Sequence, residues 1–186
     1  MSESVSEKLK KELFSNPENG RKTASEEVLK EADSYAEGYK DFLDRAKTER
    51  EAVETAIELA ENNGFKEFDR NKKYNAGDKV YFNNRGKSLA LAVIGSESVE
   101  SGVNISAAHI DSPRLDLKPN PLYEELELAL FKTHYYGGIK KYQWTAIPLS
   151  LHGVFVLKDG TVKKVSIGEE EEEPKFVIND LLPHLA

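Results

Sequence analysis

Residues 79–95 have the sequence KVYFNNRGKSLALAVIG, and this stretch decides the fold class. Residues 79–83 and 88–95 are short runs rich in apolar, aromatic and β-branched side chains, which is typical of strands. Asn84-Arg85-Gly86 separates the two runs, and its glycine permits the positive φ of a tight turn. We therefore predict a hairpin here, followed by a third short strand over residues 103–108.

Two amphipathic helices are predicted before this hairpin. From Ser25, a candidate N-cap, apolar residues recur at every third or fourth position up to Leu43, which places them on one helix face. A second run begins at Thr48, where Glu51 completes a capping box, and it ends before residues 62–64 (NNG). We interpret both apolar faces as packing surface. Helices followed by apolar strands predict a layered α/β domain.

The sequence changes character after residues 119–121 (PNP). From 121 to 175 the pattern predicts no helix, and we place a domain boundary near residue 120. Residues 1–120 are then the N-terminal part of an α/β domain, and residues 121–186 are part of a β-rich domain. The strands predicted in the second part are 126–135, 145–151, 153–157 and 162–167, the last two joined by a turn at 158–160 (KDG).

Composition excludes several classes of function. The 186 residues include 26 Lys+Arg and 33 Asp+Glu, a net charge of −7, which argues against a nucleic-acid binder or a protein of anionic membranes. No stretch approaches the roughly 20 apolar residues of a membrane span, and the N-terminus lacks the apolar core of a signal peptide. The absence of cysteine excludes disulfides and thiolate chemistry. We expect a cytoplasmic protein whose metal, if any, is held by His, Asp or Glu.

The last residues, 181–186 (LLPHLA), are apolar and provide no closing element. A β-rich segment as short as 121–186, with open strand edges, would be marginally stable alone. We therefore expect this sequence to be the front part of a longer polypeptide.

His109 is the histidine with the most suggestive surroundings. It follows directly on the predicted strand 103–108, and open α/β sheets bind ligands at the carboxyl ends of their strands. Asp111 lies two residues on, so both side chains point to one face of an extended backbone. A metal-bound imidazole usually has its second nitrogen held by a carboxylate, and this pair offers that arrangement. The pattern also allows a purely structural hydrogen bond.

Other polar groups carry less specific signals. Ser112 has no demonstrable histidine partner, and Arg114 and Lys118 could either neutralise a carboxylate or be solvated. The run 135–138 (YYGG) predicts a tight turn or a close approach, without the spacing of a phosphate loop. Five consecutive glutamates, 169–173, repel one another and predict a solvated loop.

Four blocks of this sequence resemble the M18 family of zinc aminopeptidases. They are ISAAHIDSPRLDLKPNPLY at 105–123, YGGI at 136–139, IPLSLHG at 147–153 and NDLLPHLA at 179–186. The resemblance implies an α/β metallopeptidase domain interrupted by an inserted β-rich assembly domain, and the predicted boundary falls where that insertion would begin. It also implies a homo-oligomer, with dimers building a dodecamer in the complete protein.

The resemblance implies roles for three residues. His109 would be a zinc ligand, Asp111 the catalytic residue that orients and polarises the metal site, and His184 a zinc ligand or a substrate contact reaching a neighbouring subunit. The family's remaining ligands and its general base would lie beyond residue 186. The implied activity is zinc-dependent release of single N-terminal residues, acidic or neutral, from peptide substrates. Two zinc ions would serve each complete site, and this chain alone would be inactive.

Two other hypotheses stay open from the sequence. The chain could be a non-catalytic oligomerisation or regulatory module derived from the same family. It could also be an unrelated α/β domain in which His109 and Asp111 pair only structurally. Burial of the His109 ring against apolar side chains would favour this last reading.

Overall fold

The computed structural model of this chain describes residues 4–15, 17–145 and 147–179. The chain divides into two compact units, residues 1–41 and 42–186. Within the described residues, helices come before the first of three small sheets, and this mixture of helix and sheet agrees with the predicted fold class. Among the described residues, no helix has both the length and the apolar character needed to cross a bilayer.

The first unit is helical. It contains α1 (Val5–Leu13), α2 (Gly20–Thr23) and most of α3 (Glu26–Arg45), none of which buries a residue. The Ser25 hydroxyl accepts a hydrogen bond from the Val28 amide at 3.3 Å, which confirms the predicted start of α3. Helices α1 and α2 lie in a polar segment for which the sequence predicted no element.

Helix α4 (Glu49–Asn62) opens the second unit. The Glu51 carboxylate accepts from the Thr48 amide at 2.9 Å, and the Glu51 amide donates to the Thr48 hydroxyl at 3.4 Å. This reciprocal pair is the predicted capping box, which satisfies two of the free donors at the helix start. Gly64, with φ +83°, lies just after the end of the helix.

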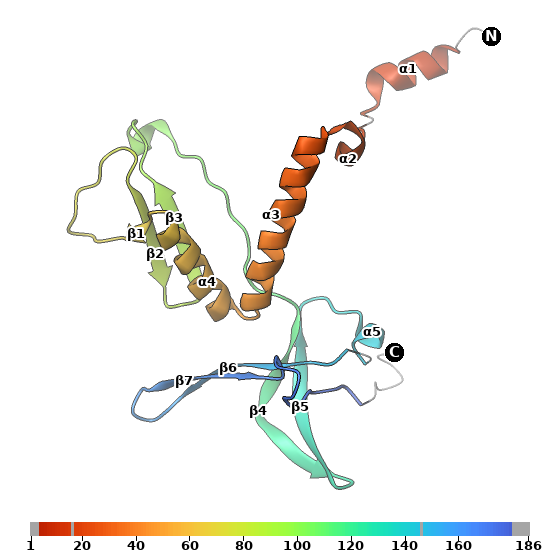
Figure 1. Cartoon of the computed structure of the whole chain (residues 1–186), viewed down its shortest axis with the longest axis vertical. Helices are drawn as coiled ribbons and strands as arrows, with labels where there is room; N and C mark the ends of the chain where they lie inside the picture. The colour runs from red at the N-terminus through yellow and green to blue at the C-terminus, as the bar shows by residue number, and fades with distance from the viewer. Residues whose placement is uncertain (1–3, 16, 146, 180–186) are drawn as a thin grey trace. The chain divides into compact units, whose positions relative to one another are not determined.

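The first sheet packs against α4 (Figure 1). In it β1 (Lys66–Glu67) runs parallel to β2 (Lys79–Asn84), and β2 runs antiparallel to β3 (Ser88–Val93). The hairpin predicted from residues 79–95 is thereby confirmed. The small core of this layer is formed by Ala52, Val53 and Ala60 of α4 with Val80 and Tyr81 of β2.

The strand predicted over 103–108 is wrong. After a short 3₁₀ turn, Val99–Ser101, the chain has no regular structure up to residue 113. Val103 and Ile105 are 61% and 81% exposed, so their apolar side chains find no packing surface among the described residues. Without a neighbouring strand, an apolar run has no ladder to join.

A long antiparallel ribbon follows, formed by β4 (Arg114–Glu125) and β5 (Leu128–Tyr136). The sequence did not predict β4 because Pro119 and Pro121 cannot donate to a ladder. The register shifts between Leu117 and Leu122, so the prolines occupy an irregularity rather than regular pairs. The predicted domain boundary near residue 120 falls within β4 and stays a prediction.

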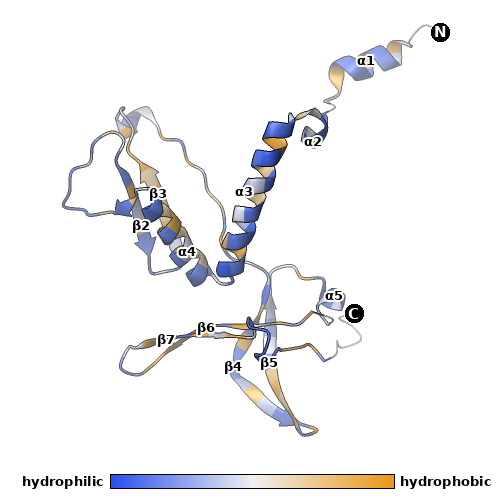
Figure 2. Cartoon of the chain, in the orientation of Figure 1, coloured by the Kyte–Doolittle hydropathy of each residue, from blue (hydrophilic) through white to orange (hydrophobic). Residues whose placement is uncertain are grey.

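The last elements are α5 (Lys141–Trp144) and the hairpin of β6 (Leu151–Val156) and β7 (Val162–Ile167). The predicted strand 162–167 is confirmed, and 153–157 overlaps β6. The predicted strand 145–151 is wrong: its described part has one isolated bridge, from Leu149 to Phe176, before β6 begins, because Pro148 lacks an amide hydrogen. Apolar residues colour much of β3 and β6 orange in Figure 2.

Candidate active site

His109 and Asp111 lie close together just before β4. The His109 Nδ1 atom is 3.0 Å from the Asp111 carboxylate Oδ1 and 2.9 Å from the Asp111 main-chain oxygen. Both partners are oxygens that accept, so Nδ1 carries the hydrogen and the neutral ring has its lone pair on Nε2. The His109 side chain is 82% exposed, and that of Asp111 is 33% exposed. The ring is therefore accessible, with one nitrogen available to a ligand.

Tyr136, at the end of β5, holds the other side of the Asp111 carboxylate. Its hydroxyl donates to Asp111 Oδ2 at 2.7 Å. This hydrogen bond is the main reason that the pKa of Asp111 is lowered, with smaller contributions from the backbone and from His109. The same bond raises the pKa of the Tyr136 hydroxyl. Asp111 is thus an ionised acceptor with a donor on each oxygen.

The predicted close approach at residues 135–138 is confirmed by Gly137. Its φ is +75°, a left-handed conformation that favours glycine, and a Cβ there would lie 3.4 Å from Pro113. This contact brings the end of β5 against the residue that precedes β4. It therefore places Tyr136 beside Asp111.

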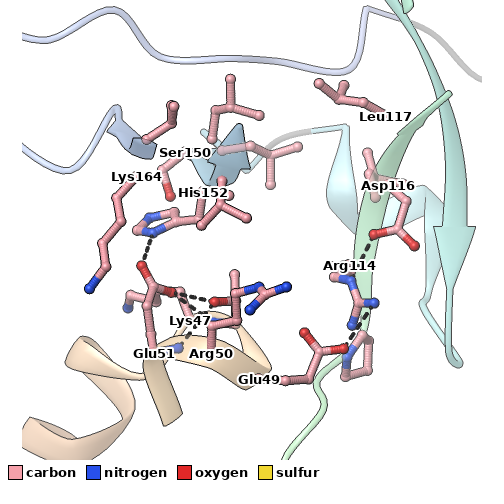
Figure 3. A pocket seen from close by; sticks show the side chains of 18 of the residues that line it. Lys47, Glu49, Arg50, Glu51, Arg114, Asp116, Leu117, Ser150, His152 and Lys164 are labelled. Atoms are coloured by element: carbon pink, nitrogen blue, oxygen red, sulfur yellow. Dashed lines mark hydrogen bonds and ion pairs between the residues drawn. The ribbon is translucent and has the colours of Figure 1, made fainter. Parts of the chain in front are cut away.

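Arg114 makes ion pairs instead of remaining free for a substrate. Its Nε donates to Asp116 at 2.7 Å, and its Nη2 lies 3.2 Å from Glu49 at the start of α4. Figure 3 shows Arg114 between these two carboxylates. The guanidinium carbon is also 4.1 Å from the centre of the Tyr136 ring, a cation–π distance. Arg114 thus joins α4, β4 and β5.

A second histidine cluster was not predicted. His152 of β6 has Nδ1 2.8 Å from the Glu51 carboxylate and Nε2 2.7 Å from the Glu169 carboxylate. Its side chain is only 11% exposed. Burial lowers the pKa of His152 and is the largest single effect, but the two carboxylates together outweigh it and the pKa is raised. An imidazole with an acceptor on both nitrogens is held as the cation.

This cluster borders a pocket of about 650 Å³ between the start of α4, the start of β4 and the β6–β7 hairpin. Figure 3 shows His152 and Glu51 pointing toward one another across it. Lys164 of β7 pairs with Glu54 of α4 at 2.6 Å, one turn further along the helix. The pocket does not include His109 in its lining. Its polar groups are engaged mainly with one another, which favours a structural role.

The glutamate run is only partly the solvated loop that was predicted. Glu169 accepts from the Ser150 hydroxyl at 2.6 Å as well as facing His152. The Glu173 carboxylate accepts from the amide of Gly168 at 2.7 Å and from two amides within the run. The bond from Ser150 is the main reason that the pKa of Glu169 is lowered, and the bond from Gly168 is the main reason that the pKa of Glu173 is lowered. The carboxylates at the two ends of the run are therefore hydrogen-bonded within the protein, and only those in the middle match the predicted solvated loop. The sequence could not distinguish them, because identical residues in one run have different local partners.

The donors among the described residues fit a zinc ion only in part. His109 provides one well-oriented nitrogen, and a catalytic zinc site needs about three protein ligands. In the part of the chain that the structure describes, no three His, Cys, Asp or Glu residues are grouped to hold a metal. His184 lies outside the described residues. The chain thus fits one part of a zinc site.

Comparison with known proteins places this chain in a family. The family profile described as Aminopeptidase I zinc metalloprotease (M18) matches residues 42–186. A probable M18 family aminopeptidase 1 of Clostridium acetobutylicum is 46% identical over 179 residues, covering 94% of this chain. The chain spans 38% of the length of that relative.

Solved structures agree with the sequence match. Aminopeptidase I from Borrelia burgdorferi superimposes with a TM-score of 0.82 and 44% identity, over 89% of this chain and 41% of that one. The mApe1 dodecamer of S. cerevisiae, 20% identical with a TM-score of 0.59 over 74% of this chain and 34% of that one, shares the fold alone. The resemblance found in the four sequence blocks is confirmed: this chain belongs to the M18 family of aminopeptidases.

Proposed function

We propose that this chain forms the first part of a zinc-dependent aminopeptidase that releases single N-terminal residues, acidic or neutral, from peptides. The observation that carries the proposal is the His109–Asp111 pair, which leaves Nε2 of an exposed imidazole open to a metal. The names of the relatives support the reaction type. The chain spans 38% of the length of its Clostridium acetobutylicum relative. We propose that its catalytic set is incomplete and that it is inactive alone.

Each candidate residue has a separate role in this proposal. His109 contributes one zinc ligand through Nε2, and Asp111 holds its ring and its tautomer. His184 contributes a zinc ligand or a substrate contact, as the family resemblance implies. Two zinc ions, when bound, would polarise the scissile carbonyl and lower the pKa of a water molecule. Asp111 and His109 would keep one ligand oriented while other segments complete the site.

We also propose that the protein acts as a cytoplasmic homo-oligomer. Phe155 and Val156 of β6 and Val162 of β7 are 63%, 66% and 56% exposed. Exposed apolar strands of this kind support an assembly surface on the β-rich part, residues 121–186. A dimer that builds a dodecamer in the complete protein is the expected form. We propose peptide substrates from the family membership, and the net charge of −7 argues against nucleic acid and anionic membranes as partners.

A chimera tests this function directly. The chain is joined to the segment that follows the matched region in the Clostridium acetobutylicum relative, and zinc content and peptide hydrolysis are measured. We expect activity on peptides with a free amino terminus, and a loss of at least about 100-fold with His109→Ala. His134→Ala is the matched control, because His134 is exposed and only stacks on Tyr135.

Two results would contradict the enzyme. A zinc-loaded, assembled chimera without activity would favour the non-catalytic oligomerisation or regulatory module. The exposed apolar residues of β6 and β7 are compatible with that module as well. Full activity of the His109→Ala chimera would show that His109 is not part of the active site.

A further inference from the structure

The Asp111 carboxylate is oriented by two donors that come from different places. Oδ1 faces Nδ1 of His109, and Oδ2 accepts from the Tyr136 hydroxyl. A planar carboxylate with a donor on each oxygen cannot turn about its Cβ–Cγ bond without breaking one of the two hydrogen bonds. With a single donor, one oxygen has no partner in the protein, so the carboxylate is held by one hydrogen bond instead of two and its orientation is less restricted.

Little else restrains the His109–Asp111 pair. Both residues lie in the segment without helix or strand that precedes β4. The His109 side chain is 82% exposed, so packing does not fix its ring. The hydroxyl of Tyr136 is the side-chain donor that ties this pair to a strand.

Tyr136 is itself held firmly. It lies directly opposite Arg114 in the β4–β5 ladder, and the Arg114 guanidinium lies over its ring at 4.1 Å. Arg114 is fixed in turn by Asp116 and Glu49. A planar guanidinium paired with carboxylates and stacked on an aromatic ring is a rigid support.

From this arrangement we infer that Tyr136 is a positioning residue: it fixes the Asp111 carboxylate, which in turn fixes the tautomer and direction of the His109 ring. Tyr136 acts through Asp111 and does not touch the metal position. The inference rests on the proposed role of His109 as a metal ligand. The inference adds Tyr136, 25 positions from Asp111 in the sequence, to a site that the sequence indicated only through His109 and Asp111.

Tyr136→Phe tests the inference by removing only the hydroxyl. The ¹⁵N NMR signals of the His109 ring are measured on the metal-free chain at about pH 8.5, where an imidazole is neutral. We expect the Nδ1–H tautomer to dominate in the unmodified chain. In Tyr136→Phe its ratio to the other tautomer should fall about fivefold, the effect of losing one hydrogen bond.

Tyr135→Phe is the matched control. Tyr135 is the preceding residue of β5 with similar exposure, and its hydroxyl has no hydrogen bond within the described residues. It should leave the tautomer ratio unchanged. Titration with Zn²⁺ alone, followed at the His109 signals, should show association weakened about three- to tenfold by Tyr136→Phe and unaltered by Tyr135→Phe.

An unchanged tautomer ratio in Tyr136→Phe, with the β4–β5 amide signals intact, would overturn the inference. If those signals are lost, Arg114→Lys decides: it keeps the hydroxyl but removes the planar group above the ring. A smaller shift in the same direction then supports the inference, and no shift overturns it. If the unmodified chain does not bind Zn²⁺ at His109, the tautomer ratio alone decides the role of Tyr136, and the chimera separately decides the proposed function.

Discussion

His109 and His152 are both paired with carboxylates, yet the two sites differ in every other respect. His109 faces an aspartate two residues away and is 82% exposed. His152 faces glutamates 101 and 17 residues away in the sequence and is 11% exposed. One site is local and open, and the other is long-range and closed.

The difference shows that a histidine's role depends on how many of its ring nitrogens are already hydrogen-bonded to the protein. His109 uses Nδ1 alone, so Nε2 remains available for a ligand. His152 uses both nitrogens for protein carboxylates and has none left to bind with. Its function is to join α4 to the β6–β7 hairpin. The comparison therefore predicts opposite effects on stability and on metal binding.

Replacing His152 should have the largest effect on stability. His152→Ala leaves Glu51 and Glu169 facing one another without a cation, and we expect the free energy of unfolding to fall by about 2 kcal/mol. Urea denaturation of the chain at about pH 6 measures it, with His134→Ala as control, expected within about 0.5 kcal/mol. A His152→Ala chain as stable as the control would show that the cluster contributes nothing.

The pH dependence of stability should follow the same cluster. Because the pKa of His152 is raised on folding, its contribution is complete below its unfolded pKa of about 6.5 and is lost as the pH rises through the higher folded pKa. We expect a decline of at most about 1.4 kcal/mol per pH unit in that window. Denaturation at a series of pH values should show this decline, and His152→Gln should remove it. An unmodified chain with a flat profile above pH 6.5 would contradict the assignment.

Replacing His109 should have the smallest effect on stability. The ring is exposed, so His109→Ala should change the free energy of unfolding by less than about 0.5 kcal/mol while abolishing the Zn²⁺-dependent NMR shifts in this segment. Thermal unfolding and a metal titration of the same sample measure both quantities. A large loss of stability would make His109 a structural residue like His152 and would break the comparison.

The sequence predicted the elements whose signals are local. Thr48 and Glu51 are three residues apart, and their capping box is present as predicted. The hairpin of β2 and β3 depends on a turn that its own residues specify. Strand β4 was not predicted, because two prolines weaken its strand pattern. It forms nevertheless, because pairing with β5 outweighs this local effect.

The candidate site could be predicted only in part for the same reason. His109 and Asp111 are neighbours, so the pattern could suggest their contact. The bonds from Tyr136 to Asp111 and from His152 to Glu51 join residues 25 and 101 positions apart. No period or spacing encodes such contacts, because the fold creates them. A single polar residue such as Tyr136 or His152 therefore cannot be recognised as part of a site from the sequence until its partner is known.

Glu51 gives the molecule one further property. Its Oε2 caps α4 at Thr48, while its Oε1 meets the imidazole of His152. The first turn of the helix and the distant hairpin therefore share one side chain, and fraying of that turn withdraws the carboxylate from the hairpin. Helix nucleation and hairpin docking are coupled, so this part of the chain should melt cooperatively and not element by element.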